Sequence, residues 1–208
     1  KVFLSTEMAG DRDLRGLLKK HQIPVEVMEK RTASRMVGED TSHQGVIATA
    51  DTTALVLDFK DFAAKLQPTE DTMLVIMDEL NDPHNVGAII RSAAAFGSAG
   101  VLMPTHNQAP ITGAVVKSSA GMAFRVPLVS IGNVNYAIEA LQKMGFKAYA
   151  LAMKGSKSIS KVVFDAPSVF IVGNEATGIR PQTLENCDDG VRIPMNPRCE
   201  SLNASVSA

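Results

Sequence analysis

Beyond Thr72, short apolar runs alternate with stretches of helical spacing, and this alternation limits the possible folds more than any other feature. Strands are predicted at residues 73–77, 100–103, 147–152, 169–172 and 191–193. Helices are predicted between them, at residues 85–96, 112–118, 133–144 and 181–187. Such an alternation is typical of an α/β fold with a mainly parallel sheet that helices cover on both faces.

The first fifty residues show a smaller version of the same pattern. Strand-like segments occur at 2–4, 25–28 and 44–48, and helical spacing occurs at 11–20 and 30–36. Residues 1–50 are therefore predicted to form a small α/β domain, and residues 72–208 a second, larger domain. Residues 51–71 are polar with one amphipathic stretch around 55–66, and they end in Pro68-Thr69-Glu70-Asp71. This stretch is predicted to be the linker between the two domains.

The composition is that of an ordinary soluble protein, with 45% hydrophobic and 21% charged residues, which is enough to bury a substantial core. The longest apolar runs are far too short to cross a bilayer, so no membrane span is expected. Cys187 and Cys199 belong to no C-x-x-C pair and follow no histidine cluster. Two free thiols, no structural metal and a cytoplasmic location are therefore expected.

Polar residues and glycines gather after three of the predicted strands, where an open α/β sheet binds its ligands. In the first junction a helix is predicted to start near Asn85, and Arg91 lies about two turns into it, on the same face as Gly87. A guanidinium there is suited to hold a phosphate. The alternative is that Asn85 only caps the helix and that Arg91 is a surface charge.

The second junction is the loop Gly173-Asn-Glu-Ala-Thr-Gly178, which follows the strand at 169–172. Its glycines allow the backbone to approach a ligand closely, and Glu175 can orient a hydroxyl or an ammonium group. The loop matches neither the phosphate-binding pattern that ends in Gly-Lys-Ser/Thr nor G-x-G-x-x-G. This mismatch argues against nucleoside triphosphate and dinucleotide sites.

The third junction follows Ile193-Pro-Met195, and a helix-start signal occupies residues 201–203. Helix-start amides, together with a serine or an asparagine, can receive an anionic group. The alternative is a strand, a proline-rich turn and a capped helix without a ligand.

Taken in this order, the three junctions resemble the three signature motifs of the SpoU (TrmH-like) family of ribose methyltransferases, within the SPOUT superfamily. The matching residues are N-x-G-x-x-x-R at 85–91, G-N-E-x-x-G at 173–178, and I-P-M at 193–195 followed by S-L-N-x-S-V at 201–206. The resemblance covers residues 72–208. The first fifty residues, which end in His43-Gln-Gly-Val46, also resemble the substrate-binding domain of family members that act on ribosomal RNA.

The resemblance implies an S-adenosylmethionine-dependent RNA 2′-O-ribose methyltransferase that acts on large-subunit (23S) ribosomal RNA. Two alternatives are a tRNA 2′-O-methyltransferase and a non-catalytic RNA-binding assembly factor. The resemblance also implies a C-terminal trefoil knot that holds the cofactor, a homodimer, and no metal. A nucleotide-binding metabolic enzyme is disfavoured, because the signatures of phosphate loops and dinucleotide sites are absent.

Family correspondence assigns roles to thirteen residues. Those expected to line the catalytic side are Asn85, Arg91, Glu175, Ser201 and Asn203. Those expected to hold the cofactor are Leu151, Ala152, Gly173, Asn174, Gly178, Ile193, Met195 and Leu202. In the family the arginine has been assigned the base role. Because a guanidinium is protonated at neutral pH and is a poor base, phosphate positioning and oxyanion stabilisation are favoured for Arg91.

The formal net charge of −1 shows no basic excess, so RNA binding requires local basic clusters. The two candidate clusters are Arg12, Arg15, Lys19 and Lys20, and Lys30, Arg31 and Arg35. The alternative for both clusters is a solvated helix face.

The two ends of the sequence are those expected of a fragment. The chain starts at Lys1, directly before a strand-like segment, without an initiator methionine or a signal-peptide pattern. It stops at Ala208, a few residues into the helix that is expected to complete the knot. The C-terminal helix is therefore expected to be truncated.

Overall fold

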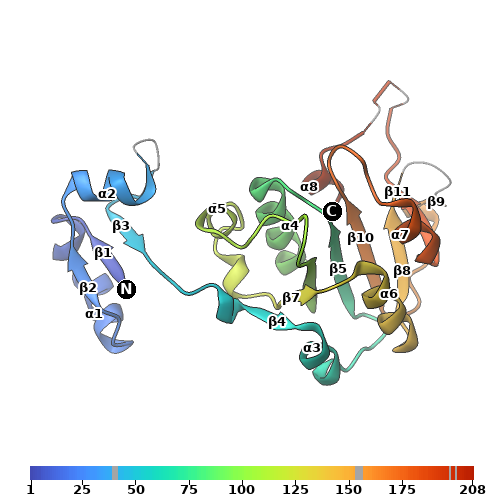
Figure 1. Cartoon of the computed structure of the whole chain (residues 1–208), viewed down its shortest axis with the longest axis horizontal. Coiled ribbons are helices and arrows are strands. Elements are labelled where there is room, and N and C mark those ends of the chain that lie inside the picture. The colour runs from blue at the N-terminus through green and yellow to red at the C-terminus, as the bar shows by residue number, and fades with distance from the viewer. Residues whose placement is uncertain (39–41, 153–156, 197, 200) are drawn as a thin grey trace. The chain divides into compact units, whose positions relative to one another are not determined.

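The structure, a computed structural model, describes residues 1–38, 42–152, 157–196, 198–199 and 201–208. Contacts within the chain divide it into two compact units, Lys1–Asp51 and Thr52–Ala208 (Figure 1). These are called unit 1 and unit 2, and all three motifs lie in unit 2.

Unit 1 is a three-stranded sheet with two helices. Its elements, in chain order, are β1 (Val2–Leu4), a 3₁₀ turn (Met8–Gly10), α1 (Arg12–Lys20), β2 (Val25–Val27), α2 (Lys30–Val37) and β3 (Val46–Ala48). Strand β1 lies between the other two, parallel to β2 and antiparallel to β3. Helix α1 begins after Asp11, whose side chain accepts the Leu14 amide at 2.8 Å. The predicted β-α-β-α-β order is confirmed.

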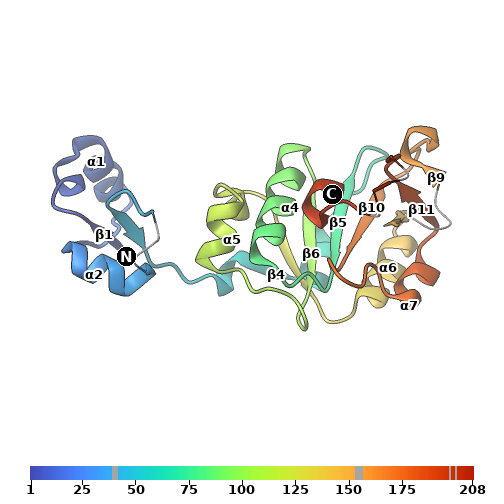
Figure 2. The same ribbon diagram turned by 90° about the horizontal axis from the view of Figure 1, so that it is seen from above.

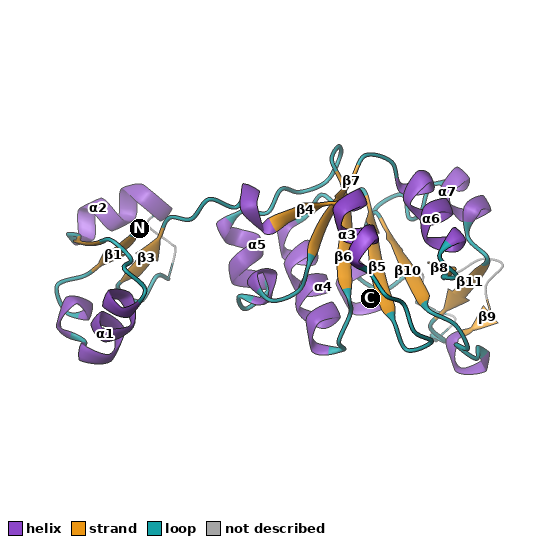
Figure 3. Cartoon of the chain, turned by 90° about the horizontal axis from the view of Figure 1, so that it is seen from below, coloured by secondary structure: helices purple, strands orange, loops and turns teal. Residues whose placement is uncertain are grey.

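Unit 2 is built on one eight-stranded sheet, in which every described strand pair is parallel (Figure 3). The strands, in sheet order, are β4 (Val56–Asp58), β7 (Leu128–Ile131), β6 (Gly100–Pro104), β5 (Met73–Asp78), β10 (Ser168–Gly173), β8 (Lys147–Leu151), β11 (Asp189–Arg192) and β9 (Lys157–Ser158). The helices are α3 (Phe59–Lys65), α4 (Pro83–Ala95), α5 (Gly113–Ser118), α6 (Val134–Lys143), α7 (Pro181–Asn186) and α8 (Ala204–Ser207). Short 3₁₀ turns occur at Thr53–Leu55, Met122–Phe124 and Ile159–Lys161. The predicted α/β fold with a mainly parallel sheet is confirmed.

Helices cover both faces of this sheet, because its central strands are apolar on both sides. In β5, Leu74 and Ile76 face a core that contains α3 and α6, whereas Val75 and Met77 face a second core that contains α4 and α5. All four side chains are buried. Figure 2 shows α4 and α5 on one side of the sheet and α6 and α7 on the other. With both faces covered, the edge formed by the strand ends is the place for a site.

Helix α4 packs closely on α5 through the glycine of the first motif. A Cβ atom at Gly87 would overlap the Ser118 side chain and would lie 2.8 Å from the Val115 carbonyl oxygen. Because a carbonyl group of the backbone cannot move aside as a flexible side chain can, the two helices approach to this distance only when residue 87 is glycine.

Gly87→Ala is therefore expected to lower the free energy of unfolding by about 1–3 kcal/mol, because the added methyl group forces α4 and α5 apart. Urea unfolding followed by circular dichroism measures the loss. Gly113→Ala is the matched control, since a Cβ at the start of α5 meets nothing within 4 Å. This control is expected to leave stability unchanged or to raise it. Equal stability of the two variants would contradict the close helix contact.

Part of the sheet lies outside the predicted strands. Residues 51–71, predicted as a linker, contain β4 and α3, and β4 pairs with β7 at one edge of the sheet. Phe59 and Phe62 of α3 are buried in the core, so the linker prediction is wrong for this stretch. Nine of its 21 residues are apolar, and most of these lie in β4 and α3.

The predicted trefoil knot depends on segments that include residues 153–156, 197 and 200, which lie outside the described residues. The knot therefore stays a prediction. Within the part of the chain that the structure describes, no helix is long and apolar enough to span a membrane.

Candidate active site

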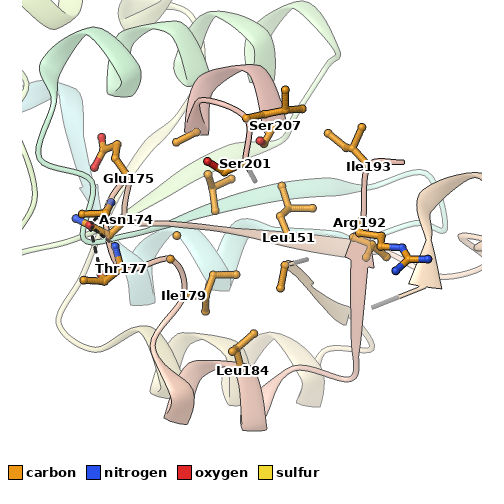
Figure 4. A pocket seen from close by; sticks show the side chains of 18 of the residues that line it. Leu151, Asn174, Glu175, Thr177, Ile179, Leu184, Arg192, Ile193, Ser201 and Ser207 are labelled. Atoms are coloured by element: carbon orange, nitrogen blue, oxygen red, sulfur yellow. Dashed lines mark hydrogen bonds between the residues drawn. The ribbon is translucent and has the colours of Figure 1, made fainter. Parts of the chain in front are cut away.

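The carboxyl ends of β10, β8 and β11 border a cavity of about 600 Å³ (Figure 4). The three strands are adjacent and parallel, so their last residues, Gly173, Leu151 and Arg192, lie at one edge of the sheet. The eight residues expected from family correspondence to hold a cofactor all line this cavity: Leu151, Ala152, Gly173, Asn174, Gly178, Ile193, Met195 and Leu202. The cavity thus occupies the edge at which an open parallel sheet binds ligands.

The loop between Gly173 and Gly178 closes on itself. Asn174 and Gly178 exchange two backbone hydrogen bonds, at 3.0 and 2.9 Å, and Asn174 Oδ1 accepts the amides of Ala176 and Thr177 at 2.9 and 3.2 Å. Gly178 has a φ of +71°, a value that favours glycine. A Cβ atom at Gly173 would overlap the backbone of residue 178. Both glycines are therefore required for closure of the loop, and both also lie on the cavity wall.

Side chains from the three motifs meet beside this loop. Asn85 Nδ2 donates to Glu175 Oε1 at 3.0 Å, and Asn203 Nδ2 donates to Asn85 Oδ1 at 3.0 Å. Asn85 is 6% exposed, and its amide is engaged at both ends, so it fixes the position of the Glu175 carboxylate. Asn203 Oδ1 in turn accepts the Ser205 amide at 2.8 Å and caps α8. The Glu175 carboxylate is thus held at a defined point of the cavity wall.

Helix α4 keeps Arg91 apart from this network. The cap of α4 is Asp82, which accepts the His84 amide at 2.8 Å, so the alternative of Asn85 as a helix cap is wrong. Six residues at about 100° each put Arg91 roughly 120° around the helix from Asn85. Arg91 is exposed and does not line the cavity. Within the described residues, its side chain makes no hydrogen bond or ion pair.

Of the five residues predicted for the catalytic side, the structure therefore brings four to one place. Asn85, Glu175 and Asn203 are joined by hydrogen bonds, and Ser201 lies on the cavity wall. Only Arg91 lies elsewhere on unit 2.

The cavity suits a ligand with a flat apolar ring system and a positive charge. Its wall is largely aliphatic and includes Leu151, Ile179 and Leu184. Among the described wall residues, Glu175 is the one carboxylate and Arg192 the one cation, and Figure 4 shows them at opposite ends. The volume lies within the range of about 300–1,000 Å³ that is typical of small-molecule sites. These features fit S-adenosylmethionine, which combines an adenine ring with a positively charged sulfonium.

Other wall residues carry no signal in the sequence. Ile179 follows the second motif directly, Leu184 lies in α7, and Ile159 lies in a 3₁₀ turn. Each is a single apolar side chain in a segment without a motif. Only the fold brings them to the cavity.

The two cysteines are free thiols. Cys187 Sγ donates to the Thr183 carbonyl oxygen at 3.2 Å, and burial raises the pKa of this thiol to about 12. Cys187 therefore stays protonated and unreactive at neutral pH. Among the described residues, no group of three or more His, Cys, Asp or Glu side chains is arranged to hold a metal ion.

Two relatives with known sequences resemble the chain over most of its length. It is 34% identical to an uncharacterised tRNA/rRNA methyltransferase of Mycoplasma pneumoniae, over 93% of this chain and 81% of the relative. It is 37% identical to the 23S rRNA (guanosine-2′-O-)-methyltransferase RlmB of Xanthomonas axonopodis pv. citri, over 82% of this chain and 69% of the relative.

A solved structure and a family model agree with the fold. The SpoU methyltransferase AviRb of Streptomyces viridochromogenes, in complex with AdoMet, matches with a TM-score of 0.76 at 23% identity, over 99% of this chain and 77% of that one. At 23% identity this match shows a shared fold. The model of the SpoU rRNA Methylase family matches residues 72–208, which include all three motifs. Since this match spans more than half of the chain, the chain belongs to the SpoU rRNA methylase family.

Proposed function

We propose that the chain transfers the methyl group of S-adenosylmethionine to a ribose 2′-hydroxyl of RNA, with 23S ribosomal RNA as the substrate. The observation that carries this proposal is the meeting of Asn85, Glu175 and Asn203 beside one cavity, from segments up to 118 residues apart. The 37% identical relative named as a 23S rRNA guanosine-2′-O-methyltransferase supports the choice of RNA. With ribosomal RNA as the substrate, the proposed site of action is the cytoplasm.

Different parts of the cavity wall suit different parts of the cofactor. Leu151, Ile193 and Leu202 offer apolar contact to the adenine ring, and the Glu175 carboxylate offers a negative charge to the sulfonium. The Asn174 side chain is already engaged by its own loop and by the Glu79 carbonyl oxygen, so it acts on the cofactor through the loop. When bound, S-adenosylmethionine supplies an electrophilic methyl group on a positively charged sulfur.

The hydrogen-bonded network orients the acceptor. Methyl transfer requires mainly that the 2′-oxygen lie in line with the methyl group and lose its proton. Glu175, held by Asn85, and the hydroxyl of Ser201 on the cavity wall are the groups suited to orient the 2′-hydroxyl. Arg91 contributes a permanent positive charge for an RNA phosphate or for the oxyanion that develops.

The position of Arg91 favours a homodimer. Arg91 does not line the cavity of its own chain, and its exposed guanidinium has no partner within the described residues. In a two-fold dimer, a residue exposed on one protomer can complete the site of the other. The proposed working unit is therefore a homodimer in which Arg91 serves the cavity of the partner protomer.

Helix α1 of unit 1 offers a basic face to RNA. Arg12, Arg15 and Lys19 lie on one side of the helix because of their spacing, and all three are exposed. Within the described residues none of them forms an ion pair. Gly16 lies on the same side, and a Cβ there would meet nothing within 4 Å. A phosphate group can therefore approach the helix backbone between the three cations.

Replacing Arg12, Arg15 and Lys19 together by alanine is expected to weaken RNA binding on the order of 10- to 100-fold. Because three phosphate contacts are lost, the negative slope of log K against log salt is expected to decrease in magnitude by about 2. Fluorescence anisotropy at several KCl concentrations measures both quantities. The affinity for S-adenosylmethionine is expected to stay unchanged, because the cavity lies in unit 2.

The matched control removes the same charge from unit 2. Its three substitutions to alanine fall on exposed lysines of α3 and α6, namely Lys60, Lys65 and Lys143. This variant is expected to bind RNA almost as wild type does. Equal losses for both triple variants would show that α1 has no special role.

The activity itself is tested with labelled S-adenosylmethionine and total RNA from cells that lack the enzyme. The RNA is separated by size and digested to nucleosides. The expected result is label in large ribosomal RNA, recovered as a 2′-O-methylated nucleoside. Label in the tRNA fraction would support the proposed methyl transfer but would contradict ribosomal RNA as the substrate. No label, together with measurable cofactor binding, favours a non-catalytic RNA-binding role.

A further inference from the structure

Arg180, the second residue after the second motif, contacts the end of β5. Arg180 Nη2 lies 2.7 Å from Asp78 Oδ1, and its Nη1 donates to Glu79 Oε1 at 3.0 Å. The Arg180 backbone amide donates to Asp78 Oδ2 at 3.3 Å. The Asp78 side chain is 0% exposed and that of Arg180 is 44% exposed. A carboxylate without solvent requires a charged partner, and Arg180 is the partner that the fold supplies.

The other end of the motif loop is attached to the same two residues. Gly173 is the register partner of Asp78 in the β10–β5 pair, and Asn174 Nδ2 donates to the Glu79 carbonyl oxygen at 2.7 Å. Glu79 has a φ of +64°, a left-handed conformation that costs energy for a residue with a side chain. The contacts from Asn174 and Arg180 therefore hold Glu79 in this conformation.

These contacts align two residues of the catalytic side, Glu175 and Asn85. Glu175 lies inside the loop whose ends are held by Asp78 and Glu79, and Asn85 lies in the helix that follows those two residues. The 3.0 Å hydrogen bond between Asn85 and Glu175 thus joins two segments that the Arg180 ion pairs keep in register.

We propose that Arg180 is a positioning residue for methyl transfer, because its ion pairs with Asp78 and Glu79 set the place of the Glu175 loop relative to Asn85. This inference rests on the proposed function for its kinetic part. The Arg180 guanidinium contacts two carboxylates at once, with an ion pair to Asp78 and a hydrogen bond to Glu79, whereas an ammonium is a single point charge. Arg180→Lys is therefore expected to keep the contact to buried Asp78 and to lose the one to Glu79.

The experiment measures two quantities on the full chain. The first is the single-turnover rate of methyl transfer from S-adenosylmethionine to RNA. The second is hydrogen exchange, without cofactor, of the loop amides of Ala176, Thr177 and Gly178, which bond to Asn174. Arg180→Met is expected to slow transfer by about 10- to 100-fold, since small misplacements of reacting groups have effects of this size. It is also expected to speed exchange of these amides by tenfold or more, and Arg180→Lys is expected to give intermediate values.

Two further variants separate positioning from general stability. Asp78→Asn/Arg180→Met removes the buried charge together with its partner, so it is expected to unfold at a temperature close to that of wild type and still to transfer slowly. This variant carries the test if Arg180→Met alone does not fold. Lys147→Met is the matched control, because it removes an ion pair with Asp165 at the start of β8, away from the loop. It is expected to leave both quantities unchanged.

A double-mutant cycle with Glu175→Gln shows whether Arg180 acts through Glu175. If it does, Arg180→Met slows the Glu175→Gln enzyme much less than it slows wild type. The inference would be overturned if the double variant loses rate by the product of the two single effects. It would also be overturned if Arg180→Met alone shows a normal rate of transfer and normal hydrogen exchange. If wild type itself transfers no methyl group, the proposed function fails, and the exchange data still decide whether Arg180 holds the loop.

Discussion

Replacing Arg91 by alanine is expected to lower the rate of methyl transfer by about 10²- to 10³-fold, the usual effect of removing a group that stabilises charge in the transition state. The Kd for S-adenosylmethionine is expected to change less than about twofold, because the proposed role of Arg91 is toward the RNA phosphate or the developing oxyanion and not toward the cofactor. Single-turnover kinetics and isothermal calorimetry measure the two quantities separately. Arg125→Ala, another exposed arginine of unit 2, is the matched control and is expected to behave as wild type.

Mixed protomers test where Arg91 acts. Arg91→Ala and Glu175→Ala are each expected to be inactive as homodimers. If Arg91 serves the partner's cavity, each mixed dimer has one complete site of two. With random pairing about half of the dimers are mixed, so the co-expressed protein is expected to show about a quarter of wild-type activity. Activity that stays at zero in a verified mixed dimer would assign Arg91 to its own chain, and full activity of Arg91→Ala alone would remove it from the reaction.

Gly173→Val is expected to abolish methyl transfer and to weaken cofactor binding by about 100-fold or more. A Cβ at this position would overlap the Gly178 carbonyl carbon and the Ile179 nitrogen, and backbone atoms cannot rotate away from it. The loop then cannot form the two hydrogen bonds between residues 174 and 178, and the cavity loses the wall that carries Glu175. A lost or displaced wall removes binding energy for both the ground state and the transition state.

The control for this prediction is Gly132→Val. A Cβ at position 132 meets nothing within 4 Å, so the same substitution is tested without a clash. It is expected to bind cofactor as wild type does, and equilibrium binding of both variants gives the comparison. Normal cofactor affinity of Gly173→Val would contradict the close approach of the loop to itself.

The parts of the fold that the sequence predicts are those with a strong local signal. Strands β5 and β10 are continuous apolar runs, and α6 follows Asn133, which accepts the Tyr136 amide at 3.0 Å. Strands β4 and β7 were missed for a physical reason. Each has only three or four residues, and β4 ends in an aspartate while β7 contains a serine. Their strand conformation comes from pairing with neighbours that are distant in sequence.

The candidate site also contains residues that the sequence predicts and residues that only the fold reveals. The motif residues Asn85, Glu175 and Asn203 are those that the resemblance to the SpoU family implies, and the structure brings them together. Arg180 was not predicted, because nothing local indicates that a residue after the loop pairs with a carboxylate 102 positions earlier. The place of Arg91 also needs the fold, since the sequence gives its helix face but not what that face contacts.

The span of the Asn85–Asn203 hydrogen bond has a consequence for how the protein is made. On a ribosome that adds about 5–20 residues per second, Asn203 follows Asn85 by roughly 6–24 s. The pair is separated by 118 residues, and Glu175 follows Asn85 by 90, so the Asn85 amide gains its second partner only when the third motif has been made. The hydrogen-bonded group of Asn85, Glu175 and Asn203 therefore cannot form before the last few of the 208 residues are made.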